Sequence, residues 1–321
     1  METIFYKIFL DKITINDNDL KYIVQSSSGN ISVLNIIVNY LRQEEIIVKN
    51  SDDSWTCNSI SRGSLSNILD KYIRQRYDRL DEYLKRTLQQ SSLLGKEFNV
   101  KQLQDSFSIL QADEWLSNIE RISHLIKHNE HGKYKDPYIF ENDEVFIYIK
   151  KQILSSFQKT WYQILIDYYI LEYQKLEESN KYTKNILTDQ ITISIKIASY
   201  CSENEQYNRS LDYYVQAITH CFTTMNYKQA SSLISTAKKI AIFSKADDYL
   251  IYQLDRMDAE CYEYLGFYST AKKHYQSCID NYDHQLLNYN LEFLEYKVAF
   301  CTYYSSRVHE AFNLAYNLRK N

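Results

Sequence analysis

Proline and glycine are scarce in this chain. Its 321 residues include one Pro and five Gly, so few positions favour a sharp turn or a break in a helix. The length suffices for two or three units that each bury their own apolar side. The shortage of turn-forming residues therefore predicts a mostly α protein with long helices and polar connections.

Clustered cations and paired cysteines are also missing. Lys and Arg number 37 against 41 Asp and Glu, for a formal net charge of −4, so no direct nucleic-acid partner is expected. The cysteines show no CxxC spacing, which predicts buried free thiols in a reducing compartment. Charged residues interrupt the apolar start from Met1 to Ile15, which predicts neither a signal peptide nor a membrane span. We expect a cytoplasmic protein with no membrane association.

Motifs of catalysis and cofactor binding are absent. The sequence has no Gly-x-Ser-x-Gly and no Gly-x-x-x-x-Gly-Lys-Ser/Thr, so we expect no enzyme and no bound cofactor. His124, His128 and His131 would share one face of a continuous helix, as ligands of Zn²⁺ do. No Cys or carboxylate cluster completes that set, and Gly132 follows it closely. A solvated helix end is the preferred interpretation, so no metal site is predicted.

A spacing of small and aromatic residues recurs in the C-terminal third. One copy has offsets of 0, 3, 7, 9, 12, 16 and 19 and comprises Ala259, Tyr262, Gly266, Tyr268, Ala271, Tyr275 and Cys278. Weaker copies comprise Ala198, Cys201, Tyr207, Ser210, Tyr214 and Ala217; Tyr227, Ala230, Ile234 and Ala237; and Ala299, Ala311, Ala315 and Leu318. Small residues at this spacing let antiparallel helices approach closely, and the offsets of small and aromatic residues are typical of tetratricopeptide repeats. Successive copies recur with a period near forty residues. A generic helical bundle with chance spacing is the alternative.

The remainder of the chain predicts three further segments. Apolar spacing predicts helices near 2–10, 17–25 and 31–43, followed by a short hairpin that includes Trp55. Helices near 84–94, 100–107 and 113–128, followed by a two-stranded wing that ends near Phe140, follow the order of a winged-helix domain. Apolar residues every three or four positions predict one connecting helix over 144–178. A membrane-surface helix is its alternative, but the polar face is not enriched in cations.

The third helix of the winged-helix segment is the one that could enter a DNA groove. It opens with Asp113 and Glu114, whose charges would repel phosphates, so we expect it to be structural.

The chain contains, in order, Ser28-Gly29-Asn30 before an apolar helix, a hairpin with Trp55, Arg76-x-x-x-Leu80, Gly95-Lys96-Glu97-Phe98, a wing and the repeats. In this order the motifs resemble the C-terminal portion of STAND-class signalling ATPases. The resemblance is to the maltose-regulator-like transcription activators and related multidomain kinases and cyclases. It implies a lid end at Gly29 and Asn30 and a winged helix that opens at the Arg76–Leu80 motif and includes the Gly95–Phe98 motif. It also implies a step into arm helices near Tyr138 to Val145. Two positions depart from the family pattern, since Ile31 stands where the family has Pro, and Asn142 where it has His.

Together these observations predict a winged-helix-like domain followed by a tetratricopeptide-like right-handed α-superhelix. The expected segments are an ATPase-lid remnant (1–62), the winged-helix-like domain (63–140), connecting arm helices (141–185) and the repeats (186–321). The expected function is a non-catalytic regulatory or scaffold protein that binds a protein, a peptide or a small effector. The alternative is part of a STAND-type regulator or ATPase whose P-loop and output domains lie outside this chain. Helical phase selects six partner-binding residues, Lys196, Tyr200, Arg256, Glu260, Glu263 and Lys297.

Overall fold

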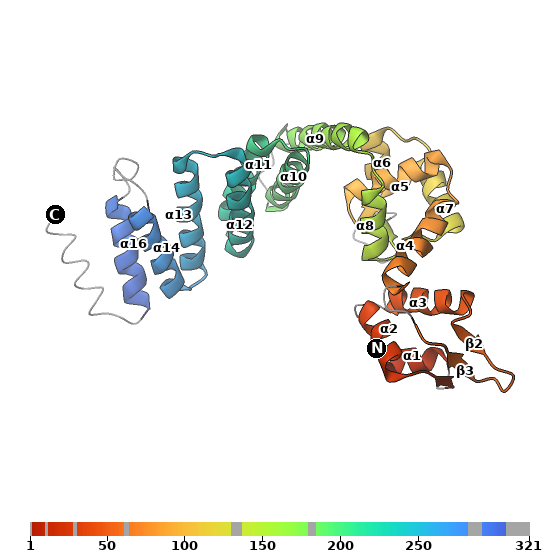
Figure 1. Cartoon of the computed structure of the whole chain (residues 1–321). Helices are drawn as coiled ribbons and strands as arrows, with labels where there is room; N and C mark the ends of the chain where they lie inside the picture. The colour runs from red at the N-terminus through yellow and green to blue at the C-terminus, as the bar shows by residue number, and fades with distance from the viewer. Residues whose placement is uncertain are drawn as a thin grey trace. The chain divides into compact units, whose positions relative to one another are not determined.

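The chain forms two compact units, Met1–Gln158 and Lys159–Asn321. The structure is a computed structural model that describes residues 2–9, 12–27, 31–60, 64–129, 137–178, 184–281 and 291–305, with backbone only at 32, 64–69 and 184. Helices dominate both units, which confirms the predicted mostly α fold class (Figure 1). The finer division into four segments stays a prediction.

The N-terminal part of the first unit packs three helices beside a small sheet. Its elements are α1 (Glu2–Ile8), β1 (Ile13–Thr14), α2 (Asp17–Ser26), α3 (Ile31–Gln43), β2 (Ile47–Lys49) and β3 (Trp55–Cys57). The predicted helices and hairpin are confirmed, whereas β1, which pairs in parallel with β3, was not predicted. The Arg42 guanidinium lies 4.6 Å from the Phe9 ring centroid and 4.7 Å from that of Trp55, so it covers one edge of the core.

The remainder of the first unit combines helices with a second three-stranded sheet. After α4 (Ser64–Tyr77) come α5 (Glu82–Leu94), β4 (Glu97–Asn99), α6 (Val100–Phe107), α7 (Ala112–Ser123), β5 (Ile126–His128) and β6 (Pro137–Phe140). The sheet has the order β4-β6-β5, with both neighbouring pairs antiparallel. Side chains cap the N-termini of α5 and α6. The Asp81 carboxylate accepts a hydrogen bond from the Leu84 amide at 2.9 Å, and the Asn99 side-chain oxygen accepts one from the Gln102 amide at 2.6 Å. Helices α5, α6 and α7 followed by two strands have the predicted order, whereas α4 and β4 were not predicted. The winged-helix assignment stays a prediction.

The predicted helix over 113–128 is wrong in its last turn. The helix α7 ends at Ser123, and His124 takes a left-handed φ of 52° while its amide donates to the Glu120 carbonyl. Residues 126–128 form β5, because pairing with β6 satisfies their backbone groups. His124 and His128 therefore share no helical face, and His131 lies outside the described residues.

The single connecting helix predicted over 144–178 is also wrong. The structure has α8 (Asp143–Lys151) and α9 (Ser155–Glu178), separated at residues 152–154. At the break the Gln152 carbonyl accepts a hydrogen bond from Gln89 Nε2 at 3.2 Å, and Ile153 is buried. A tertiary hydrogen bond and a buried side chain thus interrupt an apolar pattern that is compatible with one continuous helix.

The second unit is an array of antiparallel helices. After α9 come α10 (Lys184–Glu203), α11 (Tyr207–Thr223), α12 (Tyr227–Ser244), α13 (Asp248–Tyr264), α14 (Tyr268–Asn281) and α16 (Leu291–Tyr304). Each helix from α10 to α14 packs on the next, and α14 packs on α16 (Figure 1). This sequential packing confirms a tetratricopeptide-like superhelix. The weaker copy that begins at Tyr227 lies on α12, and Ala311, Ala315 and Leu318 lie outside the described residues.

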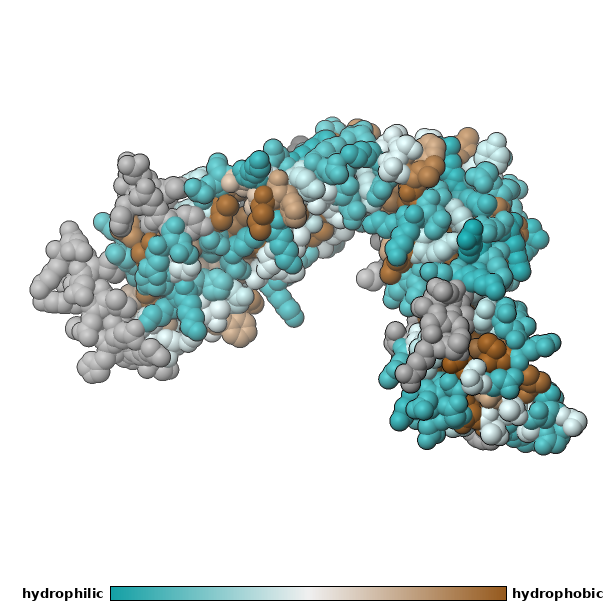
Figure 2. Space-filling view, in the orientation of Figure 1, coloured by the Kyte–Doolittle hydropathy of each residue, from teal (hydrophilic) through white to brown (hydrophobic). Residues whose placement is uncertain are grey.

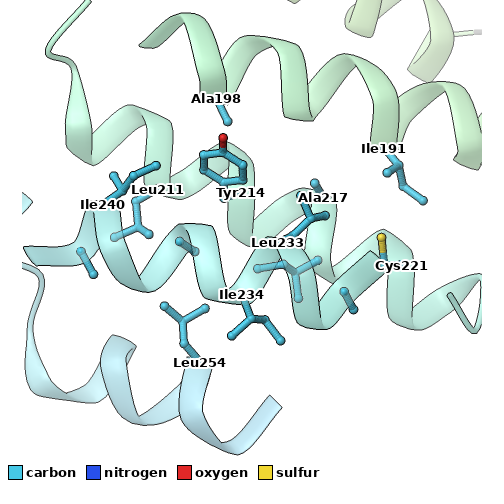
Figure 3. Packing of buried hydrophobic residues seen from close by; sticks show 14 of the residues in the cluster. Ile191, Ala198, Leu211, Tyr214, Ala217, Cys221, Leu233, Ile234, Ile240 and Leu254 are labelled. Carbon is cyan, nitrogen blue, oxygen red and sulfur yellow. The ribbon is translucent and has the colours of Figure 1, made fainter. Parts of the chain in front are cut away.

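Small residues sit where the helices approach most closely. Ala198, Ala217, Ala230 and Ala237 are completely buried, and the Ser210 hydroxyl donates to the Ala198 carbonyl at 2.7 Å. In Figure 3 the Tyr214 ring of α11 points toward Ala198 of α10, and Leu254 of α13 points toward Ile234 of α12. A larger side chain at these alanines would force the helices apart, which explains the recurrence of small residues in the sequence.

The four turns that connect α10 to α14 share one conformation. Glu205, Met225, Lys245 and Gly266 all have positive φ, of 61°, 58°, 51° and 81°, and lie 20 or 21 residues apart. The residue after each of them donates its amide to a carbonyl five positions back, as from Asn226 to Cys221 at 2.8 Å. This is the Schellman ending of a helix, which normally favours glycine. The array therefore repeats a turn geometry for which only one of its four sites has the preferred residue.

Candidate partner-binding site

Four of the six predicted partner-binding residues lie together on α13 and α16. Arg256 Nη1 lies 2.9 Å from Glu260 Oε1 within α13. Lys297 Nζ of α16 lies 2.7 Å from Glu263 Oε1 of α13. The second oxygen of Glu263 accepts a 2.7 Å hydrogen bond from Tyr275 Oη of α14. Glu263 thus joins three helices through two charge-assisted hydrogen bonds.

The other two predicted residues lie elsewhere in the unit, on α10. Lys196 Nζ donates to Tyr169 Oη of α9 at 3.0 Å and lies 4.8 Å from the centroid of that ring. Burial lowers the pKa of the Lys196 ammonium. Tyr200 is 8% exposed and stacks on Tyr169 with ring centroids 5.8 Å apart. Both side chains therefore pack against α9, and the structure does not bring them to the other four.

A second charged group on α13 was not predicted from the sequence. Lys238 of α12 lies 2.7 Å from an Asp255 carboxylate oxygen and 3.2 Å from one of Asp258. Asp258 also accepts from the Ser231 hydroxyl at 3.0 Å and lies 3.6 Å from His274 Nδ1 of α14. The signal that could have revealed this group is an Asp directly before Ala259, in the tightest part of a predicted helix pair.

The charges of α13 are recessed. From residue 250 to residue 263 no side chain of α13 is exposed, although this stretch has four carboxylates and one guanidinium. The accessible side-chain fraction is 31% for Arg256, 17% for Glu260 and 9% for Glu263. The neighbouring side chains of Lys238 and Asp255 are 28% and 33% accessible, so a partner would reach Asp255, Arg256 and Lys238 most easily, Glu260 less and Glu263 only slightly. We call Asp255, Arg256, Asp258, Glu260, Glu263 and their partners Lys238 and Lys297 the α13 charge cluster.

Burial and pairing oppose each other in the α13 charge cluster. Burial raises the pKa of the Glu260 carboxyl, and Arg256 opposes that shift. Burial also disfavours the charged form of Lys238, but the hydrogen bond and charge of Asp255 and the charge of Asp258 outweigh it and raise the pKa of that ammonium. The cluster is thus a set of fixed charges, and such a set can orient a bound polar segment.

Chemically, the cluster has hydrogen-bonding groups and no activated nucleophile. Burial raises the pKa of the thiols that interact with the cluster, Cys261, Cys278 and Cys301, to about 12, so these sulfurs stay protonated. Across the residues that the structure describes, no group of three His, Cys, Asp or Glu side chains has a geometry suited to a metal ion. The arrangement is suited to binding.

None of the helices in the described ranges has both the length and the apolar character that a membrane span requires. The visible face of the molecule is mainly hydrophilic, with hydrophobic patches between polar side chains (Figure 2).

Comparison with known proteins gives no family. No family model matches the sequence, and no curated protein matches it. The crystal structure of the apo form of RapI aligns with 78% of this chain and 76% of its own, at 12% identity and a TM-score of 0.29. A STAND protein with a tetratricopeptide repeat sensor from Pyrococcus horikoshii aligns with 99% of this chain and 54% of its own, at 11% identity and a TM-score of 0.28. Similarity at this level carries no argument about function.

Proposed function

We propose that this chain is a non-catalytic regulatory or scaffold protein that binds a protein or peptide partner through the α13 charge cluster. The observation that carries the proposal is the recessed row of charges on α13, each held by a neighbouring side chain. Charges that are already fixed lose little conformational freedom when a partner binds. Helical repeat arrays offer extended surfaces of this kind.

The charges of the cluster favour a particular partner chemistry. Four carboxylates stand against three cations, and His274 adds a further donor or acceptor. A peptide segment with a Lys or Arg side chain would complement the excess carboxylate, and Arg256 can bind a backbone carbonyl or a carboxylate. We infer a polar segment with at least one cation.

A peptide library displayed on phage tests this proposal and needs no identified partner. Selection on the full chain is expected to enrich sequences that contain Lys or Arg. The double variant Arg256→Gln/Glu260→Gln removes an intrahelical pair and should weaken the selected peptides at least tenfold. The matched control is Lys159→Gln/Glu205→Gln, which removes an exposed ion pair of 2.7 Å. If no sequence is enriched, or if both double variants bind alike, the proposal fails.

The second candidate function is that the chain is part of a STAND-type transcription regulator or signalling ATPase. The order of a winged-helix-type segment followed by a helical array supports it. In that case the tagged chain should co-purify with a P-loop ATPase, while calorimetry of the chain alone with MgATP shows no heat of binding. Micromolar binding of ATP by the chain alone would contradict both candidate functions.

A cytoplasmic location is the remaining part of the proposal. All six cysteines are unpaired and five of them are buried, which supports a reducing compartment.

A further inference from the structure

A cavity lies between α9, α10 and α11, away from the α13 charge cluster. Its volume is about 550 Å³, and its walls include Tyr173 and Leu176 of α9, Leu187 and Gln190 of α10, and Gln216 and His220 of α11. Small-molecule pockets commonly have volumes of roughly 300 to 1,000 Å³ and mostly apolar walls with a few convergent polar groups. This cavity meets that description.

The polar groups on its wall form an uncharged network. Tyr173 Oη accepts from Gln216 Nε2 at 2.8 Å and lies 3.0 Å from His220 Nε2. Burial raises the pKa of the Tyr173 phenol to about 12 and lowers the pKa of the His220 imidazole. Both groups are therefore neutral near pH 7. The network fixes a phenol, an amide and an imidazole at one wall without any formal charge.

Gln190 supplies the observation that points to a ligand. Its side chain is 7% exposed and lines the cavity, yet it makes no hydrogen bond within the described part of the chain. Its amide atoms are not among the fully buried, unpaired side-chain atoms of the described residues, so the amide faces the cavity, where water or a bound molecule can pair with it. An amide offers both a donor and an acceptor. The cavity thus contains an unpaired amide that a bound molecule can satisfy.

We propose that this cavity binds a small, uncharged, mainly apolar molecule whose amide or hydroxyl group pairs with Gln190. Leu176, Ile186 and Leu187 receive the apolar part. The one charged side chain among the lining residues that the structure describes is Glu177, which is exposed and disfavours an anion. The proposal does not rest on the α13 charge cluster or on a protein partner.

Two probes with one ring system test the ligand chemistry on the full chain. Indole-3-acetamide and indole-3-acetate have arms of the same length, of which the first is neutral and the second is negatively charged. Calorimetry and ligand-detected NMR should show the amide binding with a Kd of about 1 mM or tighter, in line with its size. The acetate should bind at least tenfold more weakly, because Glu177 repels it and the wall has no cation to pair with it. Equal binding of the amide and the acetate would overturn the proposal.

Three variants test whether the amide binds in this cavity. Gln190→Leu keeps the side-chain size and removes the amide, so the affinity for indole-3-acetamide should fall about tenfold. Leu187→Trp fills the cavity and should abolish binding while circular dichroism stays unchanged. Thr192→Val is the control, since Thr192 lies on the same helix and its hydroxyl donates to the Thr188 carbonyl instead. No binding of the amide at 10 mM, or equal binding by wild type, Gln190→Leu and Leu187→Trp, contradicts the proposal. If Gln190→Leu does not fold, the selectivity of the wild type and the Leu187→Trp result decide.

Discussion

Two polar networks lie in different parts of one helical array and differ in the charge and the pairing of their polar groups. Between α9 and α11 the groups are neutral, and Gln190 stays unpaired beside a cavity. Along α13 the groups are charged. Each of its four clustered carboxylates, those of Asp255, Asp258, Glu260 and Glu263, forms an ion pair with a neighbouring side chain. An unpaired buried charge costs far more than an unpaired amide, so only the neutral network can tolerate a group without a partner.

The largest effect on stability should come from breaking the pair between α13 and α16. Lys297→Met keeps the length of the side chain and leaves the buried Glu263 carboxylate without its cation. We expect the free energy of unfolding to fall by about 3 kcal/mol, measured by urea denaturation. The double variant Lys297→Met/Glu263→Gln should regain at least half of the loss. A single variant as stable as wild type would show that the pair is not buried in solution.

A matched change in the neutral network should cost less. Gln216→Leu removes the amide that donates to Tyr173 Oη, while His220 remains as a partner of that hydroxyl. The expected loss is about 1 kcal/mol in the same denaturation experiment. If Gln216→Leu lowered the free energy of unfolding as much as Lys297→Met does, the proposed difference between the two networks would be contradicted.

The shared turns of the array predict a stabilising substitution. Met225 has a φ of 58° and a side chain that is 76% exposed, so Met225→Gly removes backbone strain and little contact. Because the turn favours glycine, we expect a gain of about 0.5 to 1 kcal/mol. Met225→Ala keeps the Cβ atom and should show no gain. Destabilisation by glycine would contradict the left-handed turn.

The smallest expected effect is a dependence of stability on pH. Burial lowers the pKa of His220 in the folded chain, and Glu177 opposes the shift. The unfolded chain therefore binds the proton more readily, and stability is lost as pH falls below about 6.5. His220→Gln should lose less stability than wild type between pH 7 and pH 5. Identical pH profiles would mean that the imidazole is not desolvated.

The sequence predicted the array well because its packing needs small residues at fixed spacing. Ala198, Ser210, Ala259 and Ala271 are buried where the repeat pattern places them. Helical phase also placed Arg256, Glu260 and Glu263 in one region of α13, since residues three or four apart share a helix face. Lys297 joins them because α16 packs beside α13 and α14.

Other features depended on contacts that no local pattern reveals. The apolar residues near Ile126 fit a helix as well as a strand, and pairing with β6 decides for the strand. The packing of Lys196 and Tyr200 depends on α9, whose contact with α10 cannot be read from either helix alone. The cavity beside Gln190 likewise forms only when three helices meet.

Binding of one selected cationic peptide to four versions of the chain tests the central claim most directly. The versions are wild type, Arg256→Gln/Glu260→Gln, Gln190→Leu and Lys159→Gln/Glu205→Gln, each measured by fluorescence anisotropy. The account predicts at least a tenfold rise in Kd for the change on α13 and less than a twofold change for the other two. Equal affinity across all four versions would contradict the assignment of the α13 charge cluster as the partner-binding site.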